Sequence, residues 1–269
     1  MKVSDIFKVE GYGVVVTGGA SGLGLAFGEV LAENGARVTL IDLNPERVAN
    51  ETKRLQAAGC DVRGAVADVT DRAALHRAVD EAAAAYGRLD VAFANAGIDS
   101  GPGFISFDGK NRPAEGAIEN YTDARWDRVI STNLTSVFTT IKAAAHHMKP
   151  RRSGRIIVTT SSAAVRIEKP VGAAYMAAKA AAAHLVRNVA LELAEYNILV
   201  NAIAPGPFVT NIGGGHARDP VVRDAFAATI PLGRMGDADE IKGLALFLAS
   251  PASSYVTGAQ FHIDGGATV

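Results

Sequence analysis

The sequence predicts an α/β fold, a doubly wound parallel sheet of seven strands with helices on both faces. Short apolar runs that suit buried strands alternate with Ala-rich amphipathic stretches along the whole chain, as in repeated strand–helix units. Polar and glycine-containing turns follow the strand-like runs. At 269 residues, with 48% hydrophobic residues and no linker-like segment, the chain is expected to form one domain over residues 1–269.

The expected elements follow directly from these runs. Strands are predicted where apolar and β-branched residues gather, at 12–17, 37–42, 61–67, 89–94, 155–161, 198–203 and 260–263. Helices are predicted to begin near Leu23, Pro45, Asp71, Asp123, Ala173, Pro220 and Asp237.

Composition excludes several classes of protein. A net charge of -1 and 20% charged residues do not suit a nucleic-acid binder. The first ten residues lack the apolar core of a signal peptide, and every Ala-rich stretch contains polar interruptions, so we expect neither secretion nor a membrane span. The one cysteine, Cys60, is expected to be inert and fits a reducing compartment, so we predict a cytoplasmic protein.

The first strand-like run leads into the glycine-rich segment Gly18-Gly-Ala-Ser21-Gly22-Leu23-Gly24 and then into an apolar helix. Glycine permits a tight turn and a close approach of phosphate, while the N–H groups at a helix start favour an anion. The spacing differs from the common dinucleotide fingerprint Gly-x-Gly-x-x-Gly, and a glycine turn without a ligand is the alternative. Because a strand and a helix flank the segment, we predict that it binds a dinucleotide.

Asp42 ends the second predicted strand, 18 residues after Gly24. A carboxylate here can accept both ribose hydroxyls of adenosine and would repel a 2′-phosphate, which favours NAD over NADP. Ser21 and Asn44 stand where a phosphate-binding arginine would otherwise be expected. The alternative role of Asp42, capping the helix that begins at Pro45, suits Asn44 better.

Polar or turn residues follow four later strands as well. They are Asp68 after the third, Asn95-Ala96-Gly97 after the fourth, Ser162 after the fifth and Pro205-Gly206 after the sixth. The carboxyl ends of parallel strands lie at one edge of a sheet, where open α/β sheets bind ligands. We therefore expect these residues to gather there.

The stretch from Ser162 to Lys179 contains a hydroxyl, a phenol and an ammonium group. Tyr175 and Lys179 are four residues apart in an Ala-rich segment, so both side chains are expected on one helix face. A nearby ammonium group favours the phenolate, and we predict that it lowers the pKa of Tyr175 towards neutral pH. Tyr-x-x-x-Lys is a weak motif by itself and gains its weight from the other residues.

Together these residues resemble the short-chain dehydrogenase/reductase family in its single-domain form. The similarity covers nearly the whole chain and implies a Rossmann-type fold. It is carried by Thr17-Gly-Gly-Ala-Ser-Gly-Leu-Gly24, Asp42, Asp68-Val69, Asn95-Ala-Gly97, Asn133, Ser162, Tyr175-x-x-x-Lys179 and Pro205-Gly206.

The resemblance implies a role for each candidate residue. Tyr175 would be the catalytic acid/base, and Ser162 would polarise the substrate oxygen, since the family's usual interval of thirteen to the tyrosine selects it over Ser161. Lys179 would bind the nicotinamide ribose and Asn133 would hold a water of the proton relay. The other cofactor contacts would be Gly18, Ser21, Gly22, Leu23, Gly24, Asp42, Asp68, Val69, Asn95, Ala96, Gly97, Pro205, Gly206, Val209 and Thr210.

The leading hypothesis is therefore an NAD-dependent oxidoreductase that transfers hydride between NAD(H) and a secondary alcohol or ketone. One alternative is an NADPH-dependent 3-oxoacyl-type ketoreductase, which Asp42 disfavours. The other is a non-catalytic dinucleotide-binding sensor, which would not need the Tyr175 phenol. Residues expected around the substrate are the apolar Val165, Val171, Phe208 and Ile212 and the polar Arg166 and Glu168.

Two long connections are expected to shape the substrate site. Residues 98–122 look like an insertion, and Phe104, Ile105 and Phe107 suggest that it is packed, either at the rim of the pocket or in a subunit contact. Residues 208–234 contain Gly213-Gly214-Gly215 and are expected to form a mobile lid or a disordered surface loop.

The remaining expectations concern metals and partners. No ligand-like spacing links the six histidines, so no metal is expected. The basic run 149–155 follows a helix, where cations complement the dipole, and is not expected to bind nucleic acid. The helix from Ala173 carries alanines on more faces than one sheet can cover, which suggests a second subunit, and the resemblance implies a homotetramer.

Overall fold

The computed structural model describes residues 2–107, 109–210, 212, 215 and 219–269. Seven parallel strands form one sheet in the order β3-β2-β1-β4-β5-β6-β7, which confirms the predicted fold class. Strand order reverses between β1 and β4, and open parallel sheets bind ligands in the crevice at such a switch point. The strands are β1 (Gly13–Thr17), β2 (Arg37–Asp42), β3 (Val62–Val66), β4 (Val91–Ala94), β5 (Gly154–Thr159), β6 (Ile198–Pro205) and β7 (Gln260–Ile263).

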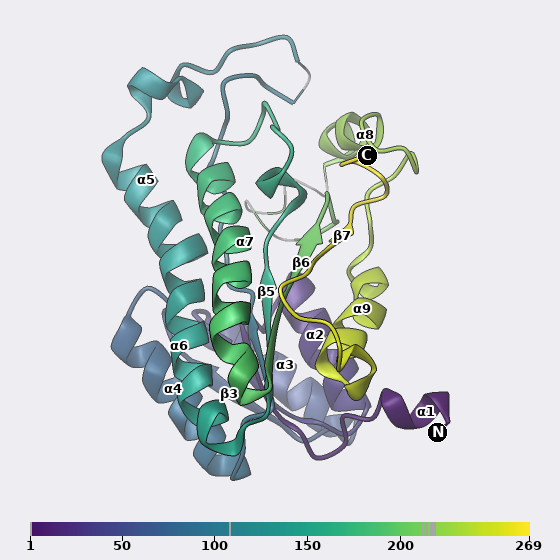
Figure 1. Ribbon diagram of the computed structural model, residues 1–269. Coiled ribbons are helices and arrows are strands. Elements are labelled where there is room, and N and C mark those ends of the chain that lie inside the picture. Colours follow the sequence, from purple (N-terminus) through teal and green to yellow (C-terminus); the bar gives the residue numbers. More distant parts are fainter. Residues whose placement is uncertain (1, 108, 211, 213–214, 216–218) are drawn as a thin grey trace.

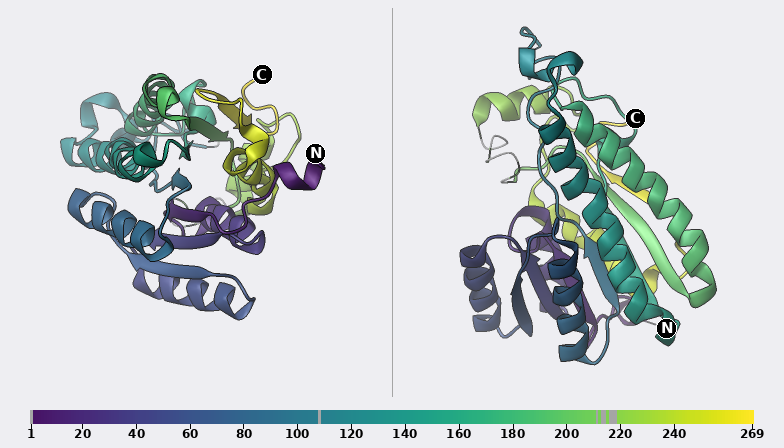
Figure 2. Two further views of the ribbon diagram at one scale, coloured as in Figure 1. Left: turned by 60° about the horizontal axis from the view of Figure 1, so that its bottom comes forward. Right: turned by 90° about the vertical axis from the view of Figure 1, so that its left-hand side faces the viewer.

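Helices cover both faces of the sheet (Figures 1 and 2). One layer holds α4 (Arg72–Tyr86), α6 (Ser136–Met148) and α7 (Ala173–Leu193), and the other holds α2 (Gly22–Glu33), α3 (Pro45–Ala57) and α9 (Lys242–Ala249). Successive strand side chains point to opposite faces, so Val15 of β1 joins the first core while Val14 and Val16 join the second. The remaining α-helices are α1 (Val3–Ile6), α5 (Asp123–Ile130) and α8 (Pro220–Ala227).

Some element boundaries differ from the predicted ones. β5 ends at Thr159, because Ser161 already caps the 3-10 turn η5 (Ser162–Ala164) through the Ala163 N–H. The helix predicted from Asp123 is interrupted by a π-helical segment, η3 (Ser131–Thr135). The helix predicted near Asp237 opens with a 3-10 turn, η8 (Ala238–Ile241). The short helix α1 was not predicted.

The 98–122 segment, predicted to be an insertion, is tied to the rest of the protein by polar contacts, while Phe104 and Phe107, which suggested packing, are 39% and 42% exposed. Arg125 of α5 holds it by donating hydrogen bonds to the carbonyls of Ser100, Pro102 and Glu115. The same guanidinium lies 4.1 Å from the centroid of the Tyr121 ring, a cation–π contact. Two short 3-10 turns, η1 (Ala114–Gly116) and η2 (Ile118–Asn120), complete the segment, and Asp108 lies outside the described residues.

The insertion lies over the carboxyl ends of the strands, at the top of Figure 1. The Gly103 N–H donates to the Pro170 carbonyl at 2.9 Å, so the insertion pairs with the loop that joins η5 to α7. The Phe107 ring meets the Phe226 ring of α8 with 5.0 Å between centroids. These contacts favour a place at the rim of the site, one of the two alternatives that the sequence left open.

The 208–234 segment is partly helical. Gly213 and Gly214 of the expected lid lie outside the described residues. Phe208, expected near the substrate, is 7% exposed and forms a backbone bridge with Gly236, and its ring lies 2.8 Å from a Cβ built on that glycine. Among the described residues, no helix combines the length and the apolar character needed to cross a bilayer.

Candidate functional site

The glycine turn between β1 and α2 has the geometry of a phosphate cradle. Gly18 and Gly22 adopt positive φ angles of 63° and 53°, which side chains disfavour. A Cβ on Gly24 would lie 2.1 Å from the Gly18 carbonyl oxygen, so the helix start can approach the turn this closely only with glycine. A cavity of about 320 Å³ beside the turn is lined by Ser21, Gly22, Val209 and Thr210 among others. The residues therefore fit a bound dinucleotide phosphate.

Asp42 is held at the carboxyl end of β2 by the turn itself. Its Oδ2 accepts from the Ala20 N–H and its Oδ1 from the Asn44 N–H, each at 3.2 Å. Asn44 caps α3 through the Arg47 N–H, as the sequence analysis expected. Asp42 is therefore oriented beside the glycine turn, while Arg47 is a cation lining the cavity there.

A chain of hydrogen bonds joins the glycine turn to α7 across three strands. The Thr17 hydroxyl accepts from the Asn95 N–H at 2.9 Å, and the Asn95 amide donates to the Thr17 carbonyl at 3.0 Å. The Asn95 Oδ1 accepts from the Thr159 hydroxyl at 3.0 Å. Lys179 Nζ then donates to the Thr159 carbonyl at 2.7 Å. Asn95, one of the polar residues predicted at this edge of the sheet, is thus connected both to the glycine turn and to Lys179.

Asn133 lies in the π-helical segment η3 and is fully buried. Its Oδ1 accepts from the Ile98 N–H at 3.0 Å and its Nδ2 donates to the Ile98 carbonyl at 3.1 Å. The side chain thereby fixes the loop after β4, and a Cβ on Gly97 would lie 2.7 Å from its Oδ1. Asn133 is thereby fixed in place, and its relay water stays a prediction.

Tyr175 and Lys179 lie on one face of α7, with Lys179 Nζ 5.6 Å from the phenol ring centroid. Burial lowers the pKa of Lys179 from 10.5 to about 8. Burial also raises the pKa of Tyr175 to about 12, against a hydrogen bond with Ser161 that lowers it. The predicted fall in the Tyr175 pKa is therefore wrong for the protein alone, because burial disfavours both charged forms.

The two serines after β5 have different partners. Ser162 Oγ donates its proton to Glu168 Oε1 at 2.9 Å. Ser161 Oγ accepts from the Ala163 N–H at 3.1 Å and shares a hydrogen bond with the Tyr175 phenol. The Ser161 hydrogen bond lowers the pKa of Tyr175, as a bond donated to the phenol oxygen does, so each serine proton has a partner in the protein alone. Ser161, whose hydroxyl is bonded to the phenol, is therefore a second candidate for the contact with the substrate oxygen, beside the predicted Ser162.

The other predicted cofactor residues lie around the same edge. Asp68 Oδ1 accepts hydrogen bonds from the Thr70 N–H and hydroxyl. Asp68 is partly exposed, and its neighbour Val69 is buried. Pro205 ends β6, and a Cβ on Gly206 would meet Asp264 at 2.6 Å. Thr210 lies opposite the glycine turn, 3.5 Å from a Cβ built on Gly22.

Sequence reasoning gave no role to three residues of this site. Thr17 and Thr159 carry the hydrogen-bond chain, and Asp99 lies close enough to Tyr175 for its charge to raise the pKa of the phenol. The position of Thr17 and Thr159 at strand ends was a usable signal. Within the run Thr159-Thr-Ser-Ser162, however, the sequence does not indicate which hydroxyl faces the phenol.

Metal chemistry has no candidate centre in the described part of the chain, where no group of three or more His, Cys, Asp or Glu side chains could hold an ion.

Comparison with known proteins places this geometry among oxidoreductases. A family model described as enoyl-(acyl carrier protein) reductase matches residues 18–268. Gluconate 5-dehydrogenase of Gluconobacter oxydans is 33% identical over 269 residues, which are 100% of this chain and 99% of that protein. A gluconate 5-dehydrogenase of Burkholderia cenocepacia, solved with NADP and tartrate, is 32% identical with a TM-score of 0.87 and covers 99% of each chain.

A second solved structure carries the other dinucleotide. It is a 7α-hydroxysteroid dehydrogenase in complex with NADH and 7-oxo glycochenodeoxycholic acid, 31% identical with a TM-score of 0.87. The alignment covers 99% of this chain and 98% of that one. Structures similar to this chain have therefore been solved with NADP and with NADH.

Ionisation of Tyr175 is directly testable. An ultraviolet difference titration of the wild type minus Tyr175→Phe isolates its phenolate signal from those of the other tyrosines. Without cofactor, we expect no Tyr175 signal at or below the ordinary tyrosine pKa of 10.0, because burial raises the pKa of the phenol to about 12. Saturating oxidised dinucleotide, which is positively charged at the nicotinamide, should move ionisation to lower pH. A phenolate signal below pH 9 without cofactor would contradict this electrostatic account.

Proposed function

We propose that this chain, which belongs to the short-chain dehydrogenase/reductase family, is an NAD-dependent oxidoreductase that interconverts a secondary alcohol and a ketone. Membership makes it an oxidoreductase of hydroxyl and keto groups, in line with the gluconate 5-dehydrogenase that it matches over its full length. The observation that carries the proposal is the Tyr175 phenol, set above a buried lysine at the edge that also holds the glycine turn.

Proton transfer is the chemistry that this chain would supply. The bound dinucleotide provides the hydride acceptor or donor. In oxidation Tyr175 takes the proton of the alcohol oxygen, and in reduction it returns one to the ketone oxygen. Ser161 donates a hydrogen bond to the same oxygen and holds it against the phenol.

Lys179 would orient the ribose of the nicotinamide half and supply positive charge. With a pKa of about 8, its amine is mostly protonated at neutral pH, although it is buried. This charge favours the phenolate form of Tyr175 and opposes the effect of burial. The phosphates would lie on the Gly18–Gly24 turn, and Asp42 would accept the adenosine ribose hydroxyls.

The choice between NAD and NADP separates the proposed function from a second candidate, an NADPH-dependent ketoreductase. The Asp42 carboxylate, already oriented by two N–H groups, supports NAD. Arg47 in the neighbouring cavity and the NADP-bound relative favour an NADPH-dependent ketoreductase. A non-catalytic dinucleotide sensor would give no reason for a serine and a lysine to be arranged around a phenol.

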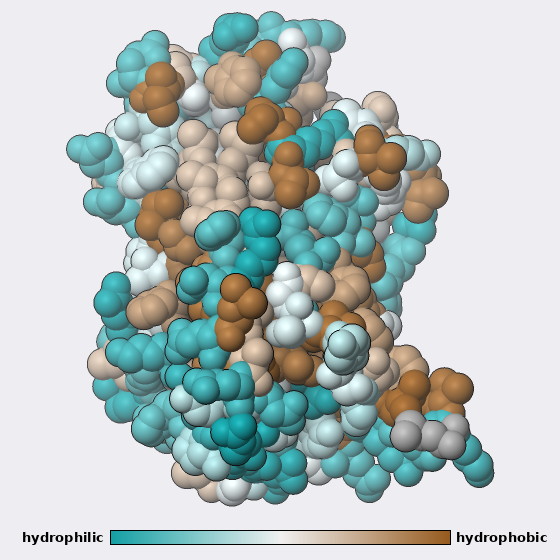
Figure 3. Space-filling model, viewed as in Figure 1, coloured by the Kyte–Doolittle hydropathy of each residue, from teal (hydrophilic) through white to brown (hydrophobic). Residues whose placement is uncertain are grey.

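We further propose a homotetramer. Ala177, Ala180 and Ala181 of α7 are exposed. An exposed apolar face on a helix often marks a contact with another subunit. Side chains of intermediate and high hydropathy gather over the upper part of this helix in Figure 3. Phe138 of α6 is 47% exposed beside α7 and lines a cavity of about 510 Å³ together with Leu134, Ala181 and Leu185.

Cofactor preference tests the proposed function. Purified protein is given a panel of secondary alcohols with NAD or NADP at equal concentration, and formation of the reduced nicotinamide is followed by absorbance. We expect kcat/KM to be at least about tenfold higher with NAD, because Asp42 repels the 2′-phosphate. Asp42→Ala should shrink this preference, and Arg47→Ala should lower turnover with NADP more than with NAD. Equal or faster turnover with NADP in the wild type would favour the ketoreductase alternative.

The two serines form a matched pair for a second test. Removing a hydrogen-bond donor from the reacting oxygen commonly lowers kcat by about 10²–10³-fold, and we expect a loss of this size for Ser161→Ala. For Ser162→Ala the loss of kcat should be at least about tenfold smaller, since its hydroxyl is bonded to Glu168 and not to the phenol. Circular dichroism and NAD binding of both variants show whether the site is intact. A larger loss for Ser162→Ala would return the assignment to Ser162.

A further inference from the structure

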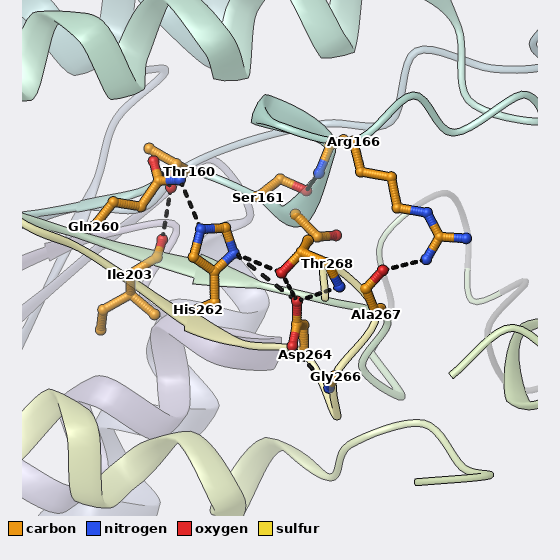
Figure 4. Close-up of polar contacts among 12 residues, drawn as sticks. Thr160, Ser161, Arg166, Ile203, Gln260, His262, Asp264, Gly266, Ala267 and Thr268 are labelled. Atoms are coloured by element: carbon orange, nitrogen blue, oxygen red, sulfur yellow. Dashed lines mark hydrogen bonds and ion pairs between the residues drawn. The ribbon is translucent and has the colours of Figure 1, made fainter. Parts of the chain in front are cut away.

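The loop between η5 and α7 is fixed at both ends, which makes its side chains part of a rigid wall. Arg166 Nη1 donates to the carbonyl of Ala267 in the C-terminal segment, as Figure 4 shows. Three residues on, the Lys169 carbonyl accepts from the Ile105 N–H at 3.3 Å, and the Pro170 carbonyl accepts from the Gly103 N–H at 2.9 Å.

Glu168 lies between these anchors with its carboxyl group turned inward. It is half-buried, and Oε1 accepts the Ser162 hydroxyl proton at 2.9 Å. Ser162 follows Ser161, which bonds to the Tyr175 phenol, so the carboxyl group lies beside the reacting centre. An ionised carboxylate offers about four acceptor sites on two oxygens, and one bond from Ser162 leaves capacity for a ligand.

Two carboxyl groups lie near the phenol, in addition to the Lys179 amine. The carboxyl groups of Glu168 and Asp99 both lie near enough to Tyr175 to raise the pKa of its phenol. Burial raises the pKa of Glu168 itself, while Ser162 and Arg166 lower it. Of the two cations on this loop, Arg166 is bound to the C-terminal segment and Lys169 is exposed. Such a wall suits a hydrogen-bond donor on the substrate and repels a carboxylate.

We propose that Glu168 is a specificity-determining residue whose carboxylate accepts a hydrogen bond from a second hydroxyl group of the substrate. The substrates would then be diols or polyols with a hydroxyl close to the reacting carbon, preferred over simple alcohols and over hydroxy acids whose carboxylate lies at that position. This inference rests on the proposed alcohol dehydrogenase activity and names its substrate class.

A substrate ladder tests the assignment. We would measure kcat and KM with saturating NAD for 2-butanol, 2,3-butanediol, 1,3-butanediol and 3-hydroxybutyrate, in the wild type and in Glu168→Gln, Glu168→Asp and Glu168→Ala. A hydrogen bond to a charged acceptor should favour the better diol over 2-butanol by about 10- to 100-fold in kcat/KM. In Glu168→Ala the ratio of kcat/KM between the better diol and 2-butanol should fall to within about threefold of unity, mainly through a higher KM for the diol. Glu168→Asp should keep part of the preference.

Controls separate this role from general effects of charge and folding. Glu119→Gln changes an exposed carboxylate in the 98–122 insertion and should keep the wild-type preference. Glu168→Gln retains the shape of the side chain, so it serves if the alanine variant does not fold.

A wild type that oxidises 2-butanol without preferring diols, a preference that persists in the Glu168 variants, or a preference for 3-hydroxybutyrate would each overturn the assignment and leave the dehydrogenase activity standing. No turnover of any alcohol with NAD or NADP would overturn both.

Discussion

The contact on which the rest of the site depends is the hydrogen bond from Lys179 Nζ to the Thr159 carbonyl, 2.7 Å long and buried. It ties α7 to the end of β5, and through Thr159, Asn95 and Thr17 it ties the helix to the glycine turn. A buried ammonium group is costly unless its protons are bonded, so the lysine must take a defined place. The phenol one turn earlier on the helix is fixed with it.

The same burial explains why the protein alone is not poised for proton transfer. Burial favours the neutral form of both groups, because it lowers the pKa of Lys179 and raises the pKa of Tyr175. Acidic neighbours add to the effect on the phenol. On this account the positive charge of the oxidised cofactor completes the site, which links binding of the dinucleotide to readiness for chemistry.

Much of this arrangement could be predicted because it depends on local sequence patterns. Apolar strand runs, the glycine turn and the four-residue spacing of Tyr175 and Lys179 each depend on neighbours in the chain, and the sheet and its switch point confirm the predicted fold. The choice between Ser161 and Ser162 depends on the direction in which the turn after β5 points each hydroxyl. A loop longer or shorter by one residue would exchange these directions. The packing of Arg125 and the π-helical segment at Asn133 likewise depend on tertiary contacts that no local pattern encodes.

The central claim is that the Tyr175 phenol exchanges the proton while hydride moves between carbon and nicotinamide. Single-turnover kinetics of Tyr175→Phe, with NAD affinity measured on the same protein by calorimetry, tests it most directly. The account predicts that NAD binds within about threefold of the wild-type affinity while hydride transfer slows by about 10²–10⁴-fold, the range typical of a general acid–base group. Hydride transfer at the wild-type rate in Tyr175→Phe would contradict it.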